Sequence, residues 1–191
     1  MSHTSGPEWL HKAMIETGAL LEGHFRLTSG LHSGSYMQCA LLLRIPRYAA
    51  KAGEALAAML RPLKPEYVVA PALGGLIIGH EVARALDIPF LFCERQEGVM
   101  TLRRFAHPGT VRFVAVEDVV TTGGSVREVG EAIAAEGAEW VGTGCIVDRS
   151  GGKAPFPHAL SSLMTTSFPV YLPEECPLCK QGLPLVKPGS R

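Results

Sequence analysis

Val114-Ala115-Val116-Glu117-Asp118-Val119-Val120-Thr121-Thr122-Gly123-Gly124-Ser125 is the stretch of this chain that decides the fold. The apolar run from Val111 to Val116 predicts a strand that is buried on both faces. Val126 to Glu136 has the spacing of an amphipathic helix. The polar loop from Thr121 to Ser125 therefore connects a buried strand to a helix.

Strands and helices alternate on both sides of this stretch. Further strands and helices are predicted at residues 67–70, 76–86, 90–93 and 140–147, with one more helix at residues 47–60. This order is typical of βαβ units, so the expected fold is α/β, a parallel twisted sheet flanked by helices. Ligands of such sheets bind at the carboxyl ends of the strands, where residues 72–75 and 117–125 lie.

The two ends of the chain have weaker patterns. Pro7 to Thr17 has helical spacing, and His24 to Ala40 indicates two short strands around a polar turn. Past Asp148 the periodicity fades. Phe168 to Leu172 is a candidate last strand, and the Pro-rich segment from Pro173 to Arg191 is expected to be irregular.

The composition argues against nucleic acid and membranes as binding partners. The 191 residues carry 18 Lys and Arg and 18 Asp and Glu, so the net charge is zero, which argues against a nucleic-acid surface. No run reaches the roughly 18 apolar residues of a membrane span, and the start shows no secretory signal. Five cysteines, an odd number, indicate free thiols in a reducing compartment. We expect a cytoplasmic protein that binds neither nucleic acid nor membrane.

The loop after the central strand has the features of a phosphate site. Backbone N–H groups around Gly123 and Gly124 can close on a phosphate at the start of a helix. Thr121, Thr122 and Ser125 add hydroxyl donors, and the loop has no lysine, so it is not the Gly-Lys-Ser/Thr nucleotide loop. The loop alone is equally compatible with an ordinary helix entry.

The adjacent carboxylates Glu117 and Asp118 favour the phosphate interpretation. Two acidic residues at the end of a buried strand are costly unless they have partners. They can accept hydrogen bonds from two neighbouring sugar hydroxyls and can hold Mg²⁺ directly or through water. An acidic pair beside a phosphate loop therefore predicts a phosphorylated sugar as ligand.

This pattern of apolar strand, acidic pair and Thr-Thr-Gly-Gly-Ser resembles the phosphoribosyl-diphosphate signature of the type I phosphoribosyltransferases. The resemblance implies Mg²⁺ as cofactor. The metal is held through the substrate, and Glu117 and Asp118 are its candidate protein ligands. It also implies that the turn at residues 71–75 holds pyrophosphate, often through a strained or cis peptide, with a plain turn as the alternative. The residues implied to bind phosphoribosyl diphosphate are Leu73, Gly74, Gly75, Arg95, Glu117, Asp118, Val119, Val120, Thr121, Thr122, Gly123, Gly124 and Ser125.

Residues 94–110 match the mobile lid hairpin of that family. A polar connection of this length in a compact domain tends to be functional, and Arg95, Arg103 and Arg104 can clamp a pyrophosphate leaving group. A solvated hairpin is the alternative. Relatives carry a lid lysine, but no lysine occurs between Lys64 and Lys153, and His107 is the remaining candidate proton donor. The expected catalytic residues are Glu117, Asp118, Arg95, Arg103 and Arg104.

Residues 18–33 and Val147-Asp148-Arg149 are similar to orotate phosphoribosyltransferases in particular. The similarity implies that Thr28, Ser29, Thr121 and Arg149 bind orotate, because a guanidinium fork suits a planar carboxylate. The implied reaction makes orotidine 5′-phosphate and pyrophosphate from orotate and phosphoribosyl diphosphate, a step of pyrimidine synthesis. A purine phosphoribosyltransferase and a non-catalytic regulator that senses phosphoribosyl diphosphate are the alternatives.

The same resemblance implies an overall organisation. Residues 1–191 form one domain, with an N-terminal helix and hood at 1–46, an α/β core at 47–172 that includes the lid at 94–110, and a tail at 173–191. The family commonly forms a homodimer in which the lid reaches the partner's site.

Cys176 and Cys179 have the spacing of a metal-binding pair. A zinc site needs about four ligands, and the sequence contains no second pair at this spacing. Cys39, Cys93, Cys145 or a second subunit are the candidates to complete one, and the sequence leaves the question open.

Overall fold

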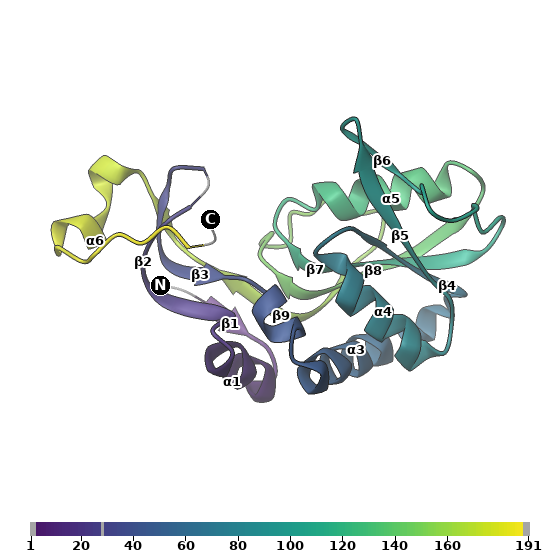
Figure 1. Ribbon diagram of the computed structural model, residues 1–191, viewed down its shortest axis with the longest axis horizontal. Coiled ribbons are helices and arrows are strands. Elements are labelled where there is room, and N and C mark those ends of the chain that lie inside the picture. Colours follow the sequence, from purple (N-terminus) through teal and green to yellow (C-terminus); the bar gives the residue numbers. More distant parts are fainter. Residues whose placement is uncertain (1–2, 28, 189–191) are drawn as a thin grey trace.

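The computed structural model describes residues 3–27 and 29–188. Figure 1 shows a large sheet between helices and, at one end of the molecule, a smaller sheet next to the C-terminal segment. The large sheet has the order β1-β9-β8-β7-β4-β5-β6. Its strands are β1 His3–Ser5, β4 Tyr67–Pro71, β5 Phe90–Gln96, β6 Val99–Thr101, β7 Arg112–Val120, β8 Glu139–Asp148 and β9 Leu160–Ser167.

The centre of the large sheet is parallel, as the alternation of strands and helices predicted. The five strands β9, β8, β7, β4 and β5 pair in parallel. Short antiparallel strands, β1 and β6, close its two edges. The carboxyl ends of the five parallel strands therefore meet at one edge of the sheet.

The central strand β7 is longer than predicted. The sequence placed its end at Val116, whereas the structure continues it to Val120 because Val119 and Val120 stay paired with Val147 and Asp148 of β8. The acidic pair therefore lies within the strand and not after it. Side chains from Phe113 to Val116 are buried, as expected for a strand covered on both faces.

Helices cover both faces of the sheet. α3 (Pro46–Leu60) and α4 (Gly75–Leu86) pack on one face, and α5 (Gly124–Ala134) packs on the other. The apolar sides of these helices and of α1 (Glu8–Glu16) and the short α2 (Ala40–Leu43) make the core. The predicted helices at 7–17, 47–60, 76–86 and 126–136 correspond to α1, α3, α4 and α5 within a few residues.

The smaller sheet has the order β10-β3-β2. β2 (Leu20–Arg26) and β3 (His32–Met37) are the predicted hairpin, and β10 (Val170–Tyr171) falls in the predicted last strand. β10 joins β3 and not the large sheet.

Several elements were missed by the sequence analysis. β9 has the Ser- and Thr-rich sequence LSSLMTTS, and β1 has only three residues, so neither has a strong strand pattern. The C-terminal segment, expected to be irregular, contains short helical turns, as does the connection after α3. These turns are η1 Arg61–Leu63, η2 Pro173–Glu175 and α6 Pro177–Lys180.

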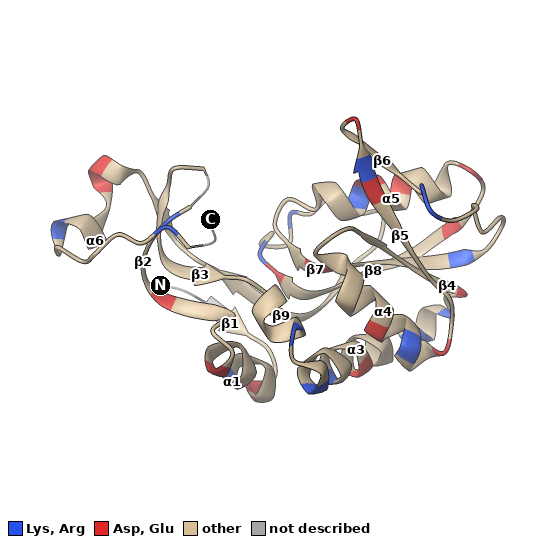
Figure 2. Ribbon diagram, viewed as in Figure 1, with Lys and Arg blue, Asp and Glu red and all other residues tan. Residues whose placement is uncertain are grey.

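Charges of both signs share the same elements. Figure 2 shows acidic and basic residues interspersed on α3, α4 and α5. Over the described part of the chain, no helix is both long enough and apolar enough to cross a membrane.

Gly53 is required where α3 crosses α4. A Cβ at this position would lie 2.5 Å from the Glu81 Cβ and 2.7 Å from the Glu81 carbonyl carbon. We expect Gly53→Ala to lower the free energy of unfolding by about 1–2 kcal/mol, because overpacking costs about 1–3 kcal/mol and outweighs the roughly 0.5–1 kcal/mol gained in helix propensity. Urea unfolding measures this change. Ala58→Gly, on the exposed side of α3, measures how much an alanine-to-glycine change in helix propensity alone alters the free energy of unfolding. A Gly53→Ala variant that is more stable than the wild type would contradict the close packing.

Candidate active site

Three strand ends of the large sheet meet at the predicted site. The loop after β7 lies beside the end of β8, since the backbone N–H of Arg149 donates to the carbonyl of Val120 at 2.8 Å. The turn after β4 lies against the acidic pair of β7. The structure thus brings together the predicted phosphate loop, the acidic pair, the turn and Arg149.

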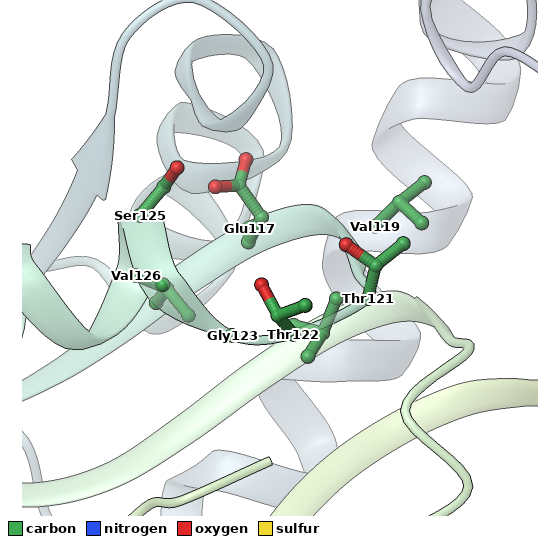
Figure 3. A pocket seen from close by; sticks show the side chains of 9 residues that line it. Glu117, Val119, Thr121, Thr122, Gly123, Ser125 and Val126 are labelled. Carbon is green, nitrogen blue, oxygen red and sulfur yellow. The ribbon is translucent and has the colours of Figure 1, made fainter. Parts of the chain in front are cut away.

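The phosphate loop presents an uncapped helix start. Gly123 has a left-handed backbone, with φ of 79°, and α5 begins at the next residue with no side-chain cap on its N–H groups. The hydroxyl-bearing residues Thr121, Thr122 and Ser125 are exposed. Figure 3 shows their hydroxyl groups and the Glu117 carboxylate lining one pocket. This loop can bind a phosphate with backbone N–H groups and hydroxyls together.

Within the acidic pair, Glu117 is buried and Asp118 is half-buried, and few hydrogen-bond donors reach either carboxylate. Glu117 is 8% exposed and accepts a bond from the Asp118 N–H at 3.3 Å, and Asp118 accepts one from the Val119 N–H at 2.8 Å. Burial, reinforced by the neighbouring Asp118, raises the pKa of Glu117 to about 9, and burial also raises the pKa of Asp118. Neither forms an ion pair with a lysine or arginine of the described residues. Hydroxyl donors or a cation would stabilise both carboxylates.

The turn after β4 lies close to these carboxylates because it contains glycine. A Cβ on Gly74 would lie 2.8 Å from Asp118 Oδ1 and 3.1 Å from Glu117 Oε1. The peptide bond between Ala72 and Leu73 is cis. The Leu73 side chain is 83% exposed, so an apolar group faces open space at this edge. The turn can therefore offer backbone groups to a ligand held by the acidic pair.

The arginines of the predicted lid are paired with acidic residues. Arg95, in the β5–β6 hairpin, binds Glu128 of α5 at 2.7 Å, while Arg104 and Arg103 both pair with Glu94. Arg95 and Arg104 line a cavity of about 380 Å³ together with Ala72 and Leu73. Arg103 does not line it.

His107 is turned towards α5. Its Nε2 lies 2.9 Å from the Ile133 carbonyl, and its Nδ1 accepts the Gly109 N–H at 3.0 Å. In this conformation the imidazole packs the loop against α5 and does not reach the strand ends.

Arg149 has the properties of an anion-binding residue. It is half-buried, and burial lowers its pKa. Its guanidinium lies 5.2 Å from the centre of the Phe168 ring, and it forms no ion pair with a carboxylate of the described residues. Ser29 lies in the β2–β3 turn and lines none of the cavities at the strand ends, while Thr28 lies outside the described residues.

One side of the site was not predicted. Gln38 and Cys39, which connect β3 to α2, and Ala40, the first residue of α2, line a second cavity of about 380 Å³ with Gly74 and Asp118. The sequence signal was weak, because α2 has only four residues and its approach to Asp118 depends on packing between distant segments.

Glu117→Gln is expected to stabilise the metal-free protein at neutral and alkaline pH. The pKa of Glu117 is raised from 4.5 to about 9, so the folded state holds this proton more tightly than the unfolded state. The free energy of unfolding of the wild type therefore falls as the pH rises from 4.5 towards 9. Glutamine does not titrate, so the variant should gain at least about 1.4 kcal/mol over the wild type near the top of this range.

Urea unfolding at several pH values, with a chelator present, measures this difference. Glu22→Gln, at an exposed position of β2, is the matched control. A difference between Glu117→Gln and the wild type that does not change with pH would contradict the raised pKa.

The comparisons with known proteins agree with this geometry. The family described as "Phosphoribosyl transferase domain" matches residues 40–163. An orotate phosphoribosyltransferase of Thermotoga petrophila is 54% identical over 184 residues, which cover 95% of this chain and 98% of that protein. One of Pelotomaculum thermopropionicum is 51% identical over 177 residues, 92% of this chain and 93% of that protein.

Solved structures share the fold. The crystal structure of orotate phosphoribosyltransferase from Aeropyrum pernix has a TM-score of 0.66 and 26% identity, and the match covers 82% of this chain and 93% of that one. The enzyme of Mycobacterium tuberculosis, in complex with Fe(III) dicitrate, has a TM-score of 0.69 at 21% identity, over 82% and 95% of the two chains. The resemblance predicted from residues 114–125 is thereby confirmed, and the chain belongs to the phosphoribosyltransferase family, among the orotate phosphoribosyltransferases.

Proposed function

We propose that this chain transfers the phosphoribosyl group of phosphoribosyl diphosphate to orotate, forming orotidine 5′-phosphate and releasing pyrophosphate. The observation that carries the proposal is the juxtaposition of the acidic pair, the uncapped α5 start and Arg149 at one edge of the sheet. Relatives that are about half identical over nearly the whole chain are named for this activity.

Phosphoribosyl diphosphate would lie across the three strand ends. The backbone and hydroxyl groups of Thr121 to Ser125 bind the 5-phosphate, and Glu117 and Asp118 accept hydrogen bonds from the ribose hydroxyls. The turn at Leu73, Gly74 and Gly75 faces the pyrophosphate. Fixing both ends of the sugar positions its C1 for attack and lowers the entropic part of the barrier.

Mg²⁺ fits the chemistry of the acidic pair. Glu117 and Asp118 are hard oxygen ligands, one buried and one half-buried, and neither pairs with a cationic side chain of the described residues. Their Oε1 and Oδ1 atoms lie on the same side, over Gly74. When bound with the substrate, Mg²⁺ neutralises charge on the pyrophosphate. The carboxylates themselves favour the positive charge that grows on the sugar in an oxocarbenium-like transition state.

The lid arginines would take the charge of the leaving group. Arg95 and Arg104 already line the cavity beside Ala72 and Leu73, and their ion pairs with Glu128 and Glu94 are exposed. Such pairs contribute about 0–1 kcal/mol, so a pyrophosphate can replace the glutamates. Arg103 would join only after the hairpin moves. Because Arg does not release a proton near neutral pH, these residues act as electrostatic clamps.

Orotate would lie between the acidic pair and Arg149. Arg149 emerges next to Thr121 at the end of β8, and its guanidinium is available for a bidentate pair with the orotate carboxylate. Ser29, in the hood at residues 1–46, would contact the base above the core at residues 47–172, as would Thr28, which lies outside the described residues.

The assembly and location follow from the same family. We propose a homodimer, with each lid reaching the partner's site, in the cytoplasm. All five cysteines are free thiols, four of them buried, in accord with a reducing compartment.

A panel of bases tests the proposed substrate. With phosphoribosyl diphosphate and Mg²⁺, we expect pyrophosphate release with orotate but not with uracil, adenine, guanine or hypoxanthine. Arg149→Ala should lower kcat/KM for orotate by about 10- to 100-fold, the loss of a charge-assisted pair worth about 1.5–3 kcal/mol. Arg44→Ala, at an exposed position, serves as the control. Pyrophosphate release with a purine but not with orotate would show that the substrate is a purine. No release with any base would contradict a transferase function.

The acidic pair is tested by Asp118→Asn. We expect turnover to fall by ~10²-fold or more, about 2.7 kcal/mol at the transition state, because the amide carries no negative charge. Circular dichroism should show an unchanged fold. Asp87→Asn, at the exposed end of α4, is the matched control. Turnover equal to the wild type would assign Asp118 to backbone hydrogen bonding alone.

A further inference from the structure

Four potential metal ligands converge in the small sheet, away from the strand ends of the large sheet. They are His24 of β2, His32 at the start of β3, Cys176 before α6 and Cys179 within it. One ligand atom from each lies within 4.8 Å of every other. Figure 1 shows β2, β3 and α6 together at one end of the molecule.

Four of the six distances between these atoms are close to the edges of a tetrahedron around zinc, and the other two are within 4.8 Å. His24 Nε2 lies 3.0 Å from His32 Nδ1, and Cys179 Sγ lies 3.3 Å from His32 Nδ1. Cys176 Sγ and Cys179 Sγ lie 3.5 and 3.6 Å from His24 Nε2. Bonds of about 2.3 Å to sulfur and 2.0–2.1 Å to nitrogen in tetrahedral geometry require N–N edges of about 3.3 Å and N–S edges of about 3.5 Å.

The surroundings orient the ligands towards a common point. The Leu183 carbonyl lies 2.9 Å from His24 Nδ1, so that nitrogen donates a proton and Nε2 keeps its lone pair for the cluster. This outer hydrogen bond is typical of metal-bound histidine. His24 and His32 are 3% and 4% exposed, and Cys176 is fully buried. A bulge between Glu22 and Phe25 breaks the alternation of β2 and lets His24 turn inward.

The small sheet buries few apolar side chains that could stabilise it. Leu20 and Phe25 are the buried apolar side chains of β2, and β3 buries only His32 and Ser33. The segment after α6 is tied to β2 by two backbone hydrogen bonds of Val186, while the Val186 side chain is 50% exposed. Small units with so little apolar burial usually need a metal or a disulfide.

We propose that His24, His32, Cys176 and Cys179 form a structural zinc site that fastens the C-terminal segment to the β2–β3 hairpin. Four protein ligands leave no position for a substrate, which makes the role structural. Two thiolates and two imidazoles select zinc over Mg²⁺, which prefers oxygen. His24 and His32 flank the β2–β3 turn, so the metal would also hold the base of the turn that carries Ser29.

Metal analysis of the full chain tests the site. Protein purified with a reducing agent and without chelator should contain about one zinc per chain by mass spectrometry of the metals. Cys179→Ser should reduce the zinc to background, whereas Cys93→Ala, which removes a thiol from the large-sheet core, should keep it. Because Cys179 is exposed, its replacement should leave the core intact. A strong chelator should lower the Tm of the wild type by several degrees and leave Cys179→Ser unchanged.

Cobalt gives a second readout that needs no variant. Co²⁺ added to zinc-free wild type should produce the visible bands of a tetrahedral ion and a near-ultraviolet thiolate band, and zinc should remove both. A wild type that takes up neither metal, a Cys179→Ser variant that keeps its zinc, or a Cys176–Cys179 disulfide in protein purified with the reducing agent would each overturn the proposal. The pyrophosphate assay is independent of these readouts, so failure of the zinc site leaves the transferase function standing.

Discussion

Two carboxylates are held inside the protein at the end of the central strand, and the site is built around the cost of keeping them there. β7 is paired with β4 and β8 and covered by helices on both faces, so Glu117 is buried, Asp118 is half-buried, and the two carboxylates face only the cavities at the strand ends. Burial raises the pKa of both groups. Partners that donate hydrogen bonds or carry positive charge relieve this cost, and a sugar with neighbouring hydroxyls and a bound cation supplies both.

Rigid and adjustable parts are separated within the site. The loop at residues 121–125, the turn at residues 72–75 and Arg149 all leave parallel strands whose positions are fixed by the core. Arg95 and Arg104 instead lie on or after an edge hairpin, and their glutamate partners are exchangeable. The proposed function uses this division, because the sugar must be held still while the leaving group is captured and released.

The small sheet must be stabilised in a different way from the large sheet. It has few buried apolar residues, and its strands come from the start and the end of the chain. The proposed zinc site would join these segments without a large core. It would also support the β2–β3 turn, whose residues the family resemblance assigns to the base. The proposed zinc site would therefore connect the stability of one end of the molecule to the geometry expected over the substrate.

The sequence by itself determined the parallel α/β core, the phosphate loop and the acidic pair, because their signals are local: an apolar strand, a glycine loop and an amphipathic helix follow one another within residues 111–136. It did not determine the strands β1 and β9 at one side of the large sheet, whose pairing is non-local and whose sequences are short or polar. Only the tertiary structure placed Arg95 and Arg104, but not Arg103, beside the turn. It also brought Cys179 to His24, 155 residues away, a contact that depends on how distant segments pack and leaves no pattern in neighbouring residues.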